Sequence, residues 1–378
     1  MKVEQAILRK RDSAGDELAT LAAIGPDLVL VFGAIDWLKA MAASLAAQFP
    51  EAIRIGCSTA GEISAEGVSD DSCVVTALRL DKSSAVEAST RLIDMADSHA
   101  AGRRLSEQLP QQGLRAVLVL GQGVAVNGSA LILGMAEVLG QHIPITGGLA
   151  GDAAAFQETW VLDSSGLHND RLVCVGLYGE DLCFSHGSFG GWSPFGPARR
   201  VTRSVNNVLF ELDGEPALDV YKRYLGDYAK DLPASGLLFP FAMLGSDHAE
   251  IGLIRTILAV SEADGSLTLA GDIDPEGYLR LMHASTDALV EGAEAAAQAA
   301  LQMLQGSGEG LALLVSCVGR KLVMGGRVDE EIEAVADVFG QGAVLAGFYS
   351  NGEISPFTGN LECKLHNQTM TITHIAER

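Results

Sequence analysis

The feature that most constrains the fold is a pattern that occurs three times along the 378-residue chain. Each copy has a short apolar run, an amphipathic stretch, and a second apolar run that ends in a glycine-rich turn. Short apolar runs rich in β-branched residues are typical of strands buried on both faces, and the amphipathic stretch is typical of a helix that covers a sheet. The pattern predicts an α/β protein with mixed sheets and covering helices, built from three repeated strand–helix–strand units.

The three copies share one order of segments: strand, helix, strand with its turn, and a further strand. They are 28–33, 36–49, 53–64 and 73–80; then 116–121, 129–140, 143–152 and 172–179; then 311–319, 329–340, 343–355 and 368–375. Each turn ends in a glycine and an acid, at Gly61–Glu62, Gly151–Asp152 and Gly352–Glu353. Glycine permits a tight turn and close approach of a ligand, so we expect the turns to gather at sheet ends that bind ligands.

The length of the chain predicts two domains, because it exceeds what one ordinary core accommodates. Further helices are predicted at 98–109, 216–226 and 285–305, and a hairpin at 254–273 with Asp264–Gly265 at its turn. The run Asp213–Pro216 breaks a strand and starts a helix. We therefore expect an N-terminal extension at 1–25, a first domain at 26–214 and a second domain at 215–378.

The charge balance is strongly acidic. The chain has 48 Asp and Glu against 26 Lys and Arg, a formal charge of −22. Such a surface repels phosphate backbones and anionic lipids, which argues against nucleic acid and membrane partners. The N-terminal residues lack the apolar region of a secretory signal, and no run approaches the ~20 apolar residues that cross a bilayer. We expect a cytoplasmic protein.

The six cysteines have no C-x-x-C spacing, which argues against a zinc ribbon or a thioredoxin-like site. Cys57 is the cysteine that suggests an enzymatic role, because it follows a buried strand and has Ser58 and Thr59 beside it. A cysteine nucleophile needs a base within hydrogen-bond reach, and no conventional cysteine-hydrolase signature is present. Catalysis, lining of a ligand pocket and a purely structural role all remain open for Cys57.

Four long motifs resemble the FIST family, in the order that family has them. IGCSTAGEI at 55–63 resembles the hallmark of the FIST N domain, and GFYSNGEISP at 347–356 resembles the closing motif of the FIST C domain. The segments GWSPFGPARRVTRS at 191–204 and ELDGEPALDVYKRYLG at 211–226 resemble the junction between the two. FIST proteins are regarded as small-ligand sensory modules of bacterial signal transduction, so the resemblance implies a sensor and not an enzyme.

Within that family, the chain resembles the haem-containing branch that senses nitric oxide. The segments SHGSFGGWSPFGP at 185–197 and LPASGLLFPFAM at 232–243 carry this resemblance. It implies non-covalent haem b, nitric oxide as a gas ligand, and a histidine kinase as the partner whose autophosphorylation is modulated.

Haem iron requires an axial ligand such as a histidine. His186 is the first candidate, because it ends a predicted strand and precedes a turn with Phe189, Trp192 and Phe195 that could wall an apolar cofactor. His283, just before the long helix predicted at 285–305, is the second candidate.

The predicted ligand-binding residues lie mainly at the three turns. They are Cys57, Ser58, Thr59, Gly61, Glu62, Gly151, Asp152, Trp192, Tyr349, Gly352 and Glu353. The acids could bind the amino group of a small ligand, or could instead accept backbone hydrogen bonds and fix their turns. Two other functions stay open: a FIST-type sensor of an amino acid or other metabolite without haem, and an enzyme with Cys57 as nucleophile.

Overall fold

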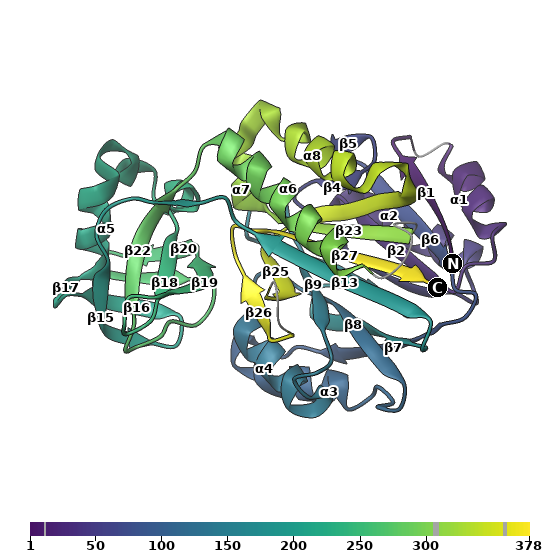
Figure 1. The fold of residues 1–378 in the computed structure, drawn as a ribbon, viewed down its shortest axis with the longest axis horizontal. Coiled ribbons are helices and arrows are strands. Elements are labelled where there is room, and N and C mark those ends of the chain that lie inside the picture. The colour runs from purple at the N-terminus through teal and green to yellow at the C-terminus, as the bar shows by residue number, and fades with distance from the viewer. Residues whose placement is uncertain (11–12, 305–309, 358–360) are drawn as a thin grey trace.

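The structure is a computed structural model, and it describes the chain except for residues 11–12, 305–309 and 358–360. A large α/β body carries a smaller lobe at one side (Figure 1). The lobe is formed by residues 193–283, which leave the body after β13 (Leu182–Phe189) and return to it at α6 (Thr286–Met303).

The body consists of three six-stranded mixed sheets, so the predicted α/β class is confirmed. The strand orders are β1-β6-β2-β3-β10-β11, β26-β25-β9-β8-β12-β7 and β13-β27-β23-β24-β4-β5. In each sheet the two strands joined by a helix are parallel neighbours: β2 with β3, β8 with β9, and β23 with β24.

Three consecutive segments of the chain supply these sheets with a similar order of elements. The first contains β1 (Lys2–Leu8), α1 (Ala14–Ala22), β2 (Leu28–Gly33), α2 (Ile35–Gln48), β3 (Ile53–Ser58), β4 (Glu62–Ser64), β5 (Gly67–Ser69) and β6 (Cys73–Arg79). The second contains β7 (Ser84–Arg91), η1 (Met95–Asp97), α3 (Ser98–Ser106), β8 (Leu114–Gly121), α4 (Gly128–Leu139), β9 (Ile145–Leu149), β10 (Val161–Asp163), β11 (Gly166–His168) and β12 (Arg171–Tyr178). The third adds to β13 and α6 the elements β23 (Gly310–Cys317), α7 (Val318–Met324), η4 (Gly325–Arg327), α8 (Asp329–Phe339), η5 (Gly340–Gly342), β24 (Ala343–Ser350), β25 (Gly352–Pro356), β26 (Cys363–His366) and β27 (Met370–Glu377).

The first residues of the chain belong to the body. The expected extension at 1–25 contains β1 and α1, and β1 pairs along its whole length with β6. Polar residues at Lys2, Glu4 and Gln5 leave only a short apolar run in this segment, which is too weak a pattern to predict the edge strand.

The apolar runs serve two cores, because successive strand residues point to opposite faces. In β2, Leu30 and Phe32 enter a core that all three sheets share, whereas Val29 and Val31 face the core beneath α1 and α2. The runs in β8 and β23 divide in the same way. Phe32 and Phe348 stack in the shared core with ring centroids 4.7 Å apart. Burial on both faces is why these runs lack the alternation of a surface strand.

A hairpin from each segment joins the sheet of another segment. β4 and β5 extend the third sheet through β24, β10 and β11 extend the first through β3, and β25 and β26 extend the second through β9. The chain crosses between sheets at the three glycine–acid turns. These crossings interlock the sheets into one body.

The lobe has a nine-stranded sheet and a separate apolar core. Its elements are β14 (Ser193–Pro194), β15 (Arg199–Val205), β16 (Val208–Leu212), β17 (Glu215–Pro216), α5 (Ala217–Leu225), η2 (Gly226–Asp231), η3 (Ala234–Leu238), β18 (Phe241–Leu244), β19 (Glu250–Arg255), β20 (Ile257–Ser261), β21 (Ser266–Leu269) and β22 (Tyr278–His283). The hairpin expected near Asp264–Gly265 is β20 and β21. The domain boundary expected after residue 214 lies inside this lobe, between β16 and β17.

Candidate functional site

The three glycine–acid turns meet at the centre of the body. The Ala60 N–H donates to the Tyr349 carbonyl at 2.8 Å, and the Gly151 N–H donates to the Ser58 carbonyl at 2.8 Å. A Cβ on Gly151 would lie 2.7 Å from the Ala60 nitrogen, so only glycine allows this approach. Gly61 has φ +137°, a conformation that also favours glycine. The turns therefore contact one another directly, and Gly151 accommodates neighbouring backbone.

Two of the acids are held by their own turns in matching ways. Glu62 accepts hydrogen bonds from the Thr59 hydroxyl at 2.5 Å and from the Ser72 hydroxyl at 2.6 Å. Glu353 accepts from the Ser350 hydroxyl at 2.6 Å and from the Thr369 hydroxyl at 3.0 Å. Burial raises the pKa of Glu62 to about 7 and that of Glu353 to about 8, although these hydrogen bonds oppose the shift. Each acid connects a turn to the residue before the strand that follows its hairpin, β6 for Glu62 and β27 for Glu353.

The third acid fixes a loop instead. Asp152 accepts hydrogen bonds from the backbone N–H groups of Phe156, Gln157 and Glu158, at 2.9, 2.6 and 3.1 Å. Gly352 lies in β25, where its nearest neighbours are the Leu149 and Leu365 side chains. The hydrogen-bond partners of all three acids therefore come from this chain. Such partners are consistent with acids that fix their turns, which is one of the two roles considered for them.

Among the other predicted ligand-binding residues, those beside the turns are buried and Trp192 is half-buried. Cys57 is fully buried in the shared core, and burial raises the pKa of its thiol well above the ordinary value. The Ser58 hydroxyl donates to the Gly151 carbonyl at 2.7 Å. Tyr349 is fully buried and its hydroxyl donates to Glu331 at 2.5 Å. Trp192 is half-buried, and its indole N–H donates to the Gln368 carbonyl at 2.7 Å.

The two haem candidates lie in different environments. His186 is fully buried in β13, and neither ring nitrogen has a hydrogen-bond partner among the described residues. Burial lowers its pKa to about 4, so the ring is neutral at physiological pH. His283 is exposed at the end of β22, with its ring centroid 5.9 Å from that of Phe195.

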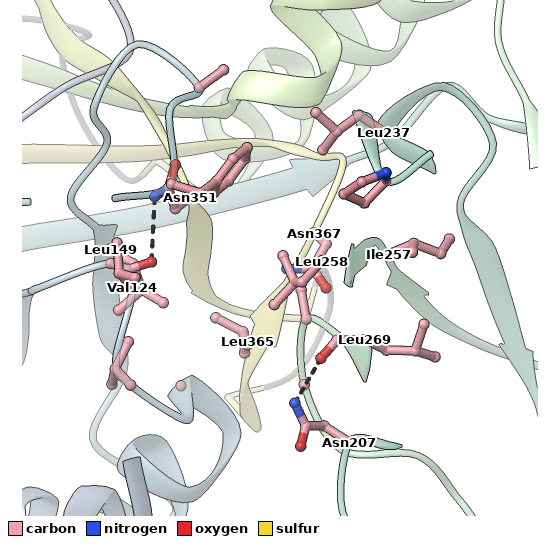
Figure 2. Close-up of a pocket in the computed structure, with 18 of the residues that line it drawn as sticks. Val124, Leu149, Asn207, Leu237, Ile257, Leu258, Leu269, Asn351, Leu365 and Asn367 are labelled. Carbon is pink, nitrogen blue, oxygen red and sulfur yellow. Dashed lines mark hydrogen bonds between the residues drawn. The ribbon is translucent and has the colours of Figure 1, made fainter. Parts of the chain in front are cut away.

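A cavity of about 660 Å³ lies between the lobe and the body (Figure 2). From the body it is lined by Met95, Gly123, Val124, Val126, Asn127, Gly128, Leu149, Ala154, Ala155, Phe156, Leu322, Asn351, Leu365 and Asn367. From the lobe it is lined by Asn207, Asp231, Leu232, Pro233, Ala234, Leu237, Ile257, Leu258, Leu269, Ala270 and Gly271. We call this cavity the interlobe pocket. Its size and largely apolar walls are typical of sites for small organic ligands.

The polar groups in the interlobe pocket are mostly asparagines. Asn351 donates to the Gly123 carbonyl at 3.3 Å, and Asn207 donates to the Leu269 carbonyl at 2.9 Å. The side-chain oxygens of Asn351 and Asn367 are buried and have no hydrogen-bond partner within the described part of the chain. Buried acceptors normally have a partner, so this pair of oxygens is the most unusual chemical feature of the pocket.

The predicted ligand-binding residues and both histidines lie outside the interlobe pocket. Their neighbours, however, line it: Ala154–Phe156 follow Asp152, and Asn351 precedes Gly352. The turns therefore shape the pocket wall without contributing their acids to it. One sequence signal could have identified Asn351 and Asn367: each is a polar residue in the short connection between two strands.

The structure offers little for haem or a metal ion. Within the described part of the chain, Met95 is the one residue lining the interlobe pocket whose side chain is of a type that ligates haem iron. His186 is enclosed within the sheet and does not line the pocket, so it does not fit a haem bound there. Across the described residues, no group of three or more His, Cys, Asp and Glu is arranged to hold a metal ion. The described residues also include no helix long and apolar enough to span a bilayer.

Comparison with known proteins gives relatives without a described activity. The chain is 33% identical over 99 residues to an uncharacterized protein of Methanocaldococcus jannaschii, which covers 25% of this chain and 19% of that one. It is 27% identical over 218 residues to an uncharacterized protein of Mycobacterium tuberculosis, which covers 56% of this chain and 54% of that one. The matched region thus spans about a fifth to a half of these relatives.

Among solved structures, a cyanuric acid hydrolase from A. caulinodans matches 100% of this chain and 99% of its own. The sequence identity is 12% and the TM-score is 0.39, and a likeness at that level carries no inference here.

Sequence-family models account for most of the chain. The FIST N domain matches residues 27–215, and the FIST C domain matches residues 217–356. Domains of this kind are in general small-ligand sensors in signal transduction. The chain belongs to the FIST family.

Proposed function

We propose that this protein is a sensor whose small-molecule ligand binds in the interlobe pocket and changes the position of the lobe relative to the body. The observation that carries the proposal is that this pocket has walls from both parts. Two of its lining residues, Asn351 and Asn367, also have buried side-chain oxygens with no partner among the described residues. A ligand shifts an equilibrium between two arrangements only if it binds them differently. A ligand that contacts both walls meets that condition.

The hydrogen bonds that join the lobe to the body lie around the pocket. Asn127 donates to the Asp272 carboxylate at 3.0 Å, Gln368 donates to the Leu237 carbonyl at 2.9 Å, and Arg255 donates to the Leu365 carbonyl at 3.2 Å. At least one residue of each pair lines the pocket. A neutral bond of this kind contributes about 1 kcal/mol and a bond to a charged group about 1.5–3 kcal/mol, so a bound ligand can compete with them.

The two connections to the lobe are held by one buried arginine. Arg320 on α7 donates to the carbonyls of Gly190, just before the lobe, and Leu289, just after it. The same guanidinium forms a fully buried ion pair with Glu331 on α8, at 2.7 Å. Gly191 packs against α6 so closely that a Cβ would lie 2.1 Å from the Ala288 carbonyl oxygen. A movement of the lobe would be passed from these connections to α7 and α8.

The protein that would receive the signal from this sensor is suggested by family resemblance alone. That resemblance points to a histidine kinase, and the surface of α7 and α8 is where we would look for it. Leu322 on α7 is 47% exposed and also lines the interlobe pocket, so this helix reaches from the ligand site to the surface.

Enzymatic activity at Cys57 is less well supported than sensing. The thiolate is the reactive form of cysteine, and burial disfavours it at Cys57. Haem and nitric oxide are the narrower version of the sensor proposal. Haem and nitric oxide binding are supported by the family resemblance of residues 185–197 and 232–243. The described side chains around the pocket give no further support for them.

A thermal-shift screen of small metabolites tests the proposal. Val124 lines the pocket from the body, so Val124→Trp should fill part of it. We expect at least one compound to raise the Tm of the parent protein and to lose that effect in Val124→Trp, because a ligand that binds only the native state stabilises it. Compounds that stabilise both proteins equally would place the ligand elsewhere.

A further inference from the structure

We infer that the ligand of the interlobe pocket is an uncharged, largely apolar molecule that carries at least one N–H or O–H donor. The inference rests on the proposed function and narrows it, because it names the ligand class and separates it from both a free amino acid and haem.

The walls give the apolar part of this assignment. Leu149 and Leu365 line the pocket from the body, and Leu237 and Leu258 line it from the lobe (Figure 2). Phe156 also lines it from the body. Leu258 is 40% exposed. Covering such surface with an apolar ligand is favourable in proportion to the area removed from water.

The unpaired side-chain oxygens indicate that the ligand carries a hydrogen-bond donor. Asn367 is 1% exposed, so its side-chain oxygen has lost water and gains no partner from the described chain. Asn351 is oriented by the hydrogen bond from its amide nitrogen to the Gly123 carbonyl, which leaves its oxygen free to accept. A buried acceptor is costly until a donor reaches it. These oxygens are closed to water in the structure, so a ligand N–H or O–H group supplies that donor only once the lobe has moved, which is the movement proposed above.

The charges exclude anions. Among the described residues that line the pocket, Asp231 is the charged one, and none is a lysine, arginine or histidine. Arg255 lies behind this wall, and its guanidinium donates to the carbonyls of Ile254, Asp272 and Leu365. A carboxylate moved from water into this site would therefore have no lining residue as a counter-charge, which is strongly unfavourable. The net charge of −22 opposes anions at longer range. This argues against an amino acid held by its carboxylate and against haem, whose propionates are anionic.

Three fluorescent probes with the same aromatic body test the inference. N-phenyl-1-naphthylamine is uncharged and has one N–H donor, its N-methyl derivative lacks the donor, and 8-anilinonaphthalene-1-sulfonate adds an anionic group. Each would be titrated into the full-length protein and into pocket-filling variants from both walls, Val124→Trp and Leu258→Trp. The acceptor is tested by Asn367→Leu, with Asn169→Leu at an exposed turn as the matched control. Circular dichroism and Tm establish that each variant is folded.

We expect the uncharged donor probe to bind the parent protein and to bind the two pocket-filling variants at least tenfold more weakly. Asn367→Leu should weaken this probe about three- to tenfold and leave the N-methyl probe unchanged, because one hydrogen bond is lost. If the sulfonate probe or haem binds at least as tightly and is displaced by filling the pocket, the ligand class is wrong but the ligand site stands. If filling the pocket changes the binding of no probe, the proposed function falls with the inference.

Discussion

The centre of the body and the boundary between body and lobe both contain buried polar groups, but these groups are satisfied differently. At the centre, Glu62 and Glu353 each accept hydrogen bonds from two hydroxyl groups of their own segment. At the boundary, Asn351 and Asn367 have side-chain oxygens with no described partner. Polar groups that the chain itself satisfies maintain the fold, whereas unpaired groups beside a cavity indicate where another molecule binds.

The largest expected effect concerns the buried arginine that connects the two regions. Arg320→Met should lower the free energy of unfolding by about 3–5 kcal/mol, because it leaves Glu331 buried without its cation. The matched control is Arg327→Met, whose ion pairs with Asp287 and Glu330 are on the surface and should matter little. Urea unfolding followed by circular dichroism measures both. Equal losses in the two variants would show that the buried pair does not hold the connections of the lobe.

A smaller effect should follow from crowding the central turns. Gly151→Ala places a Cβ 2.7 Å from the Ala60 nitrogen and 2.9 Å from the Tyr349 carbonyl oxygen. Overpacking of this kind costs about 1–3 kcal/mol. Gly15→Ala in α1 meets nothing within 4 Å and should be neutral or slightly stabilising. The comparison requires only thermal unfolding curves, and a neutral Gly151→Ala would mean that the turns are not in close contact.

The pH dependence of stability should show that Glu353, at the centre of the body, is protonated in the folded state. Burial raises the pKa of Glu353 to about 8, so between pH 4.5 and 8 the folded state keeps a proton that the unfolded state has lost. Stability from this group is therefore fully present below pH 4.5 and is lost as the pH rises towards 8. Glu353→Gln removes that loss, so its Tm relative to the parent should increase from pH 5 to pH 8.

The control for this experiment is Glu362→Gln, because Glu362 is exposed near β26. Its Tm difference from the parent should stay constant over the same pH range. A parallel course of the two variants would refute the buried, protonated state of Glu353.

The smallest expected effect is local. Trp192→Phe removes the hydrogen bond from the indole to the Gln368 carbonyl at the base of the lobe, which should cost about 1 kcal/mol. Hydrogen exchange followed by mass spectrometry should become faster in the lobe, residues 193–283, and stay unchanged in β2 and β8. Faster exchange throughout the chain would mean that the two regions unfold as one.

The sequence predicted the interior of the body better than its edges. The runs that became β2, β8 and β23 are buried on both faces, and such strands have a strong local signal. The strand β1 and the division between body and lobe were missed. An insertion leaves no local signal when its own segments have ordinary strand and helix patterns. The expected boundary after residue 214 separates two sequence motifs, and the lobe includes residues on both sides of it.

The candidate site could be predicted only in part. The glycine–acid turns were a correct indication of where the sheets meet, because a glycine such as Gly151 permits close backbone contact. The sequence does not show whether an acid is satisfied by its own chain. That depends on Ser72 and Thr369, which lie 10 and 16 residues beyond their acids. The interlobe pocket needs Leu149 and Leu258 on opposite walls, a pairing that no spacing rule predicts.

The most direct test of the account is to measure N-phenyl-1-naphthylamine binding by two variants side by side. Leu258→Trp changes the wall of the interlobe pocket, and Glu353→Gln changes a central turn with little change in shape. We predict that Leu258→Trp loses at least tenfold in affinity and that Glu353→Gln binds like the parent. Loss of binding in Glu353→Gln, with binding retained in Leu258→Trp, would contradict the account and place the ligand at the acidic turns.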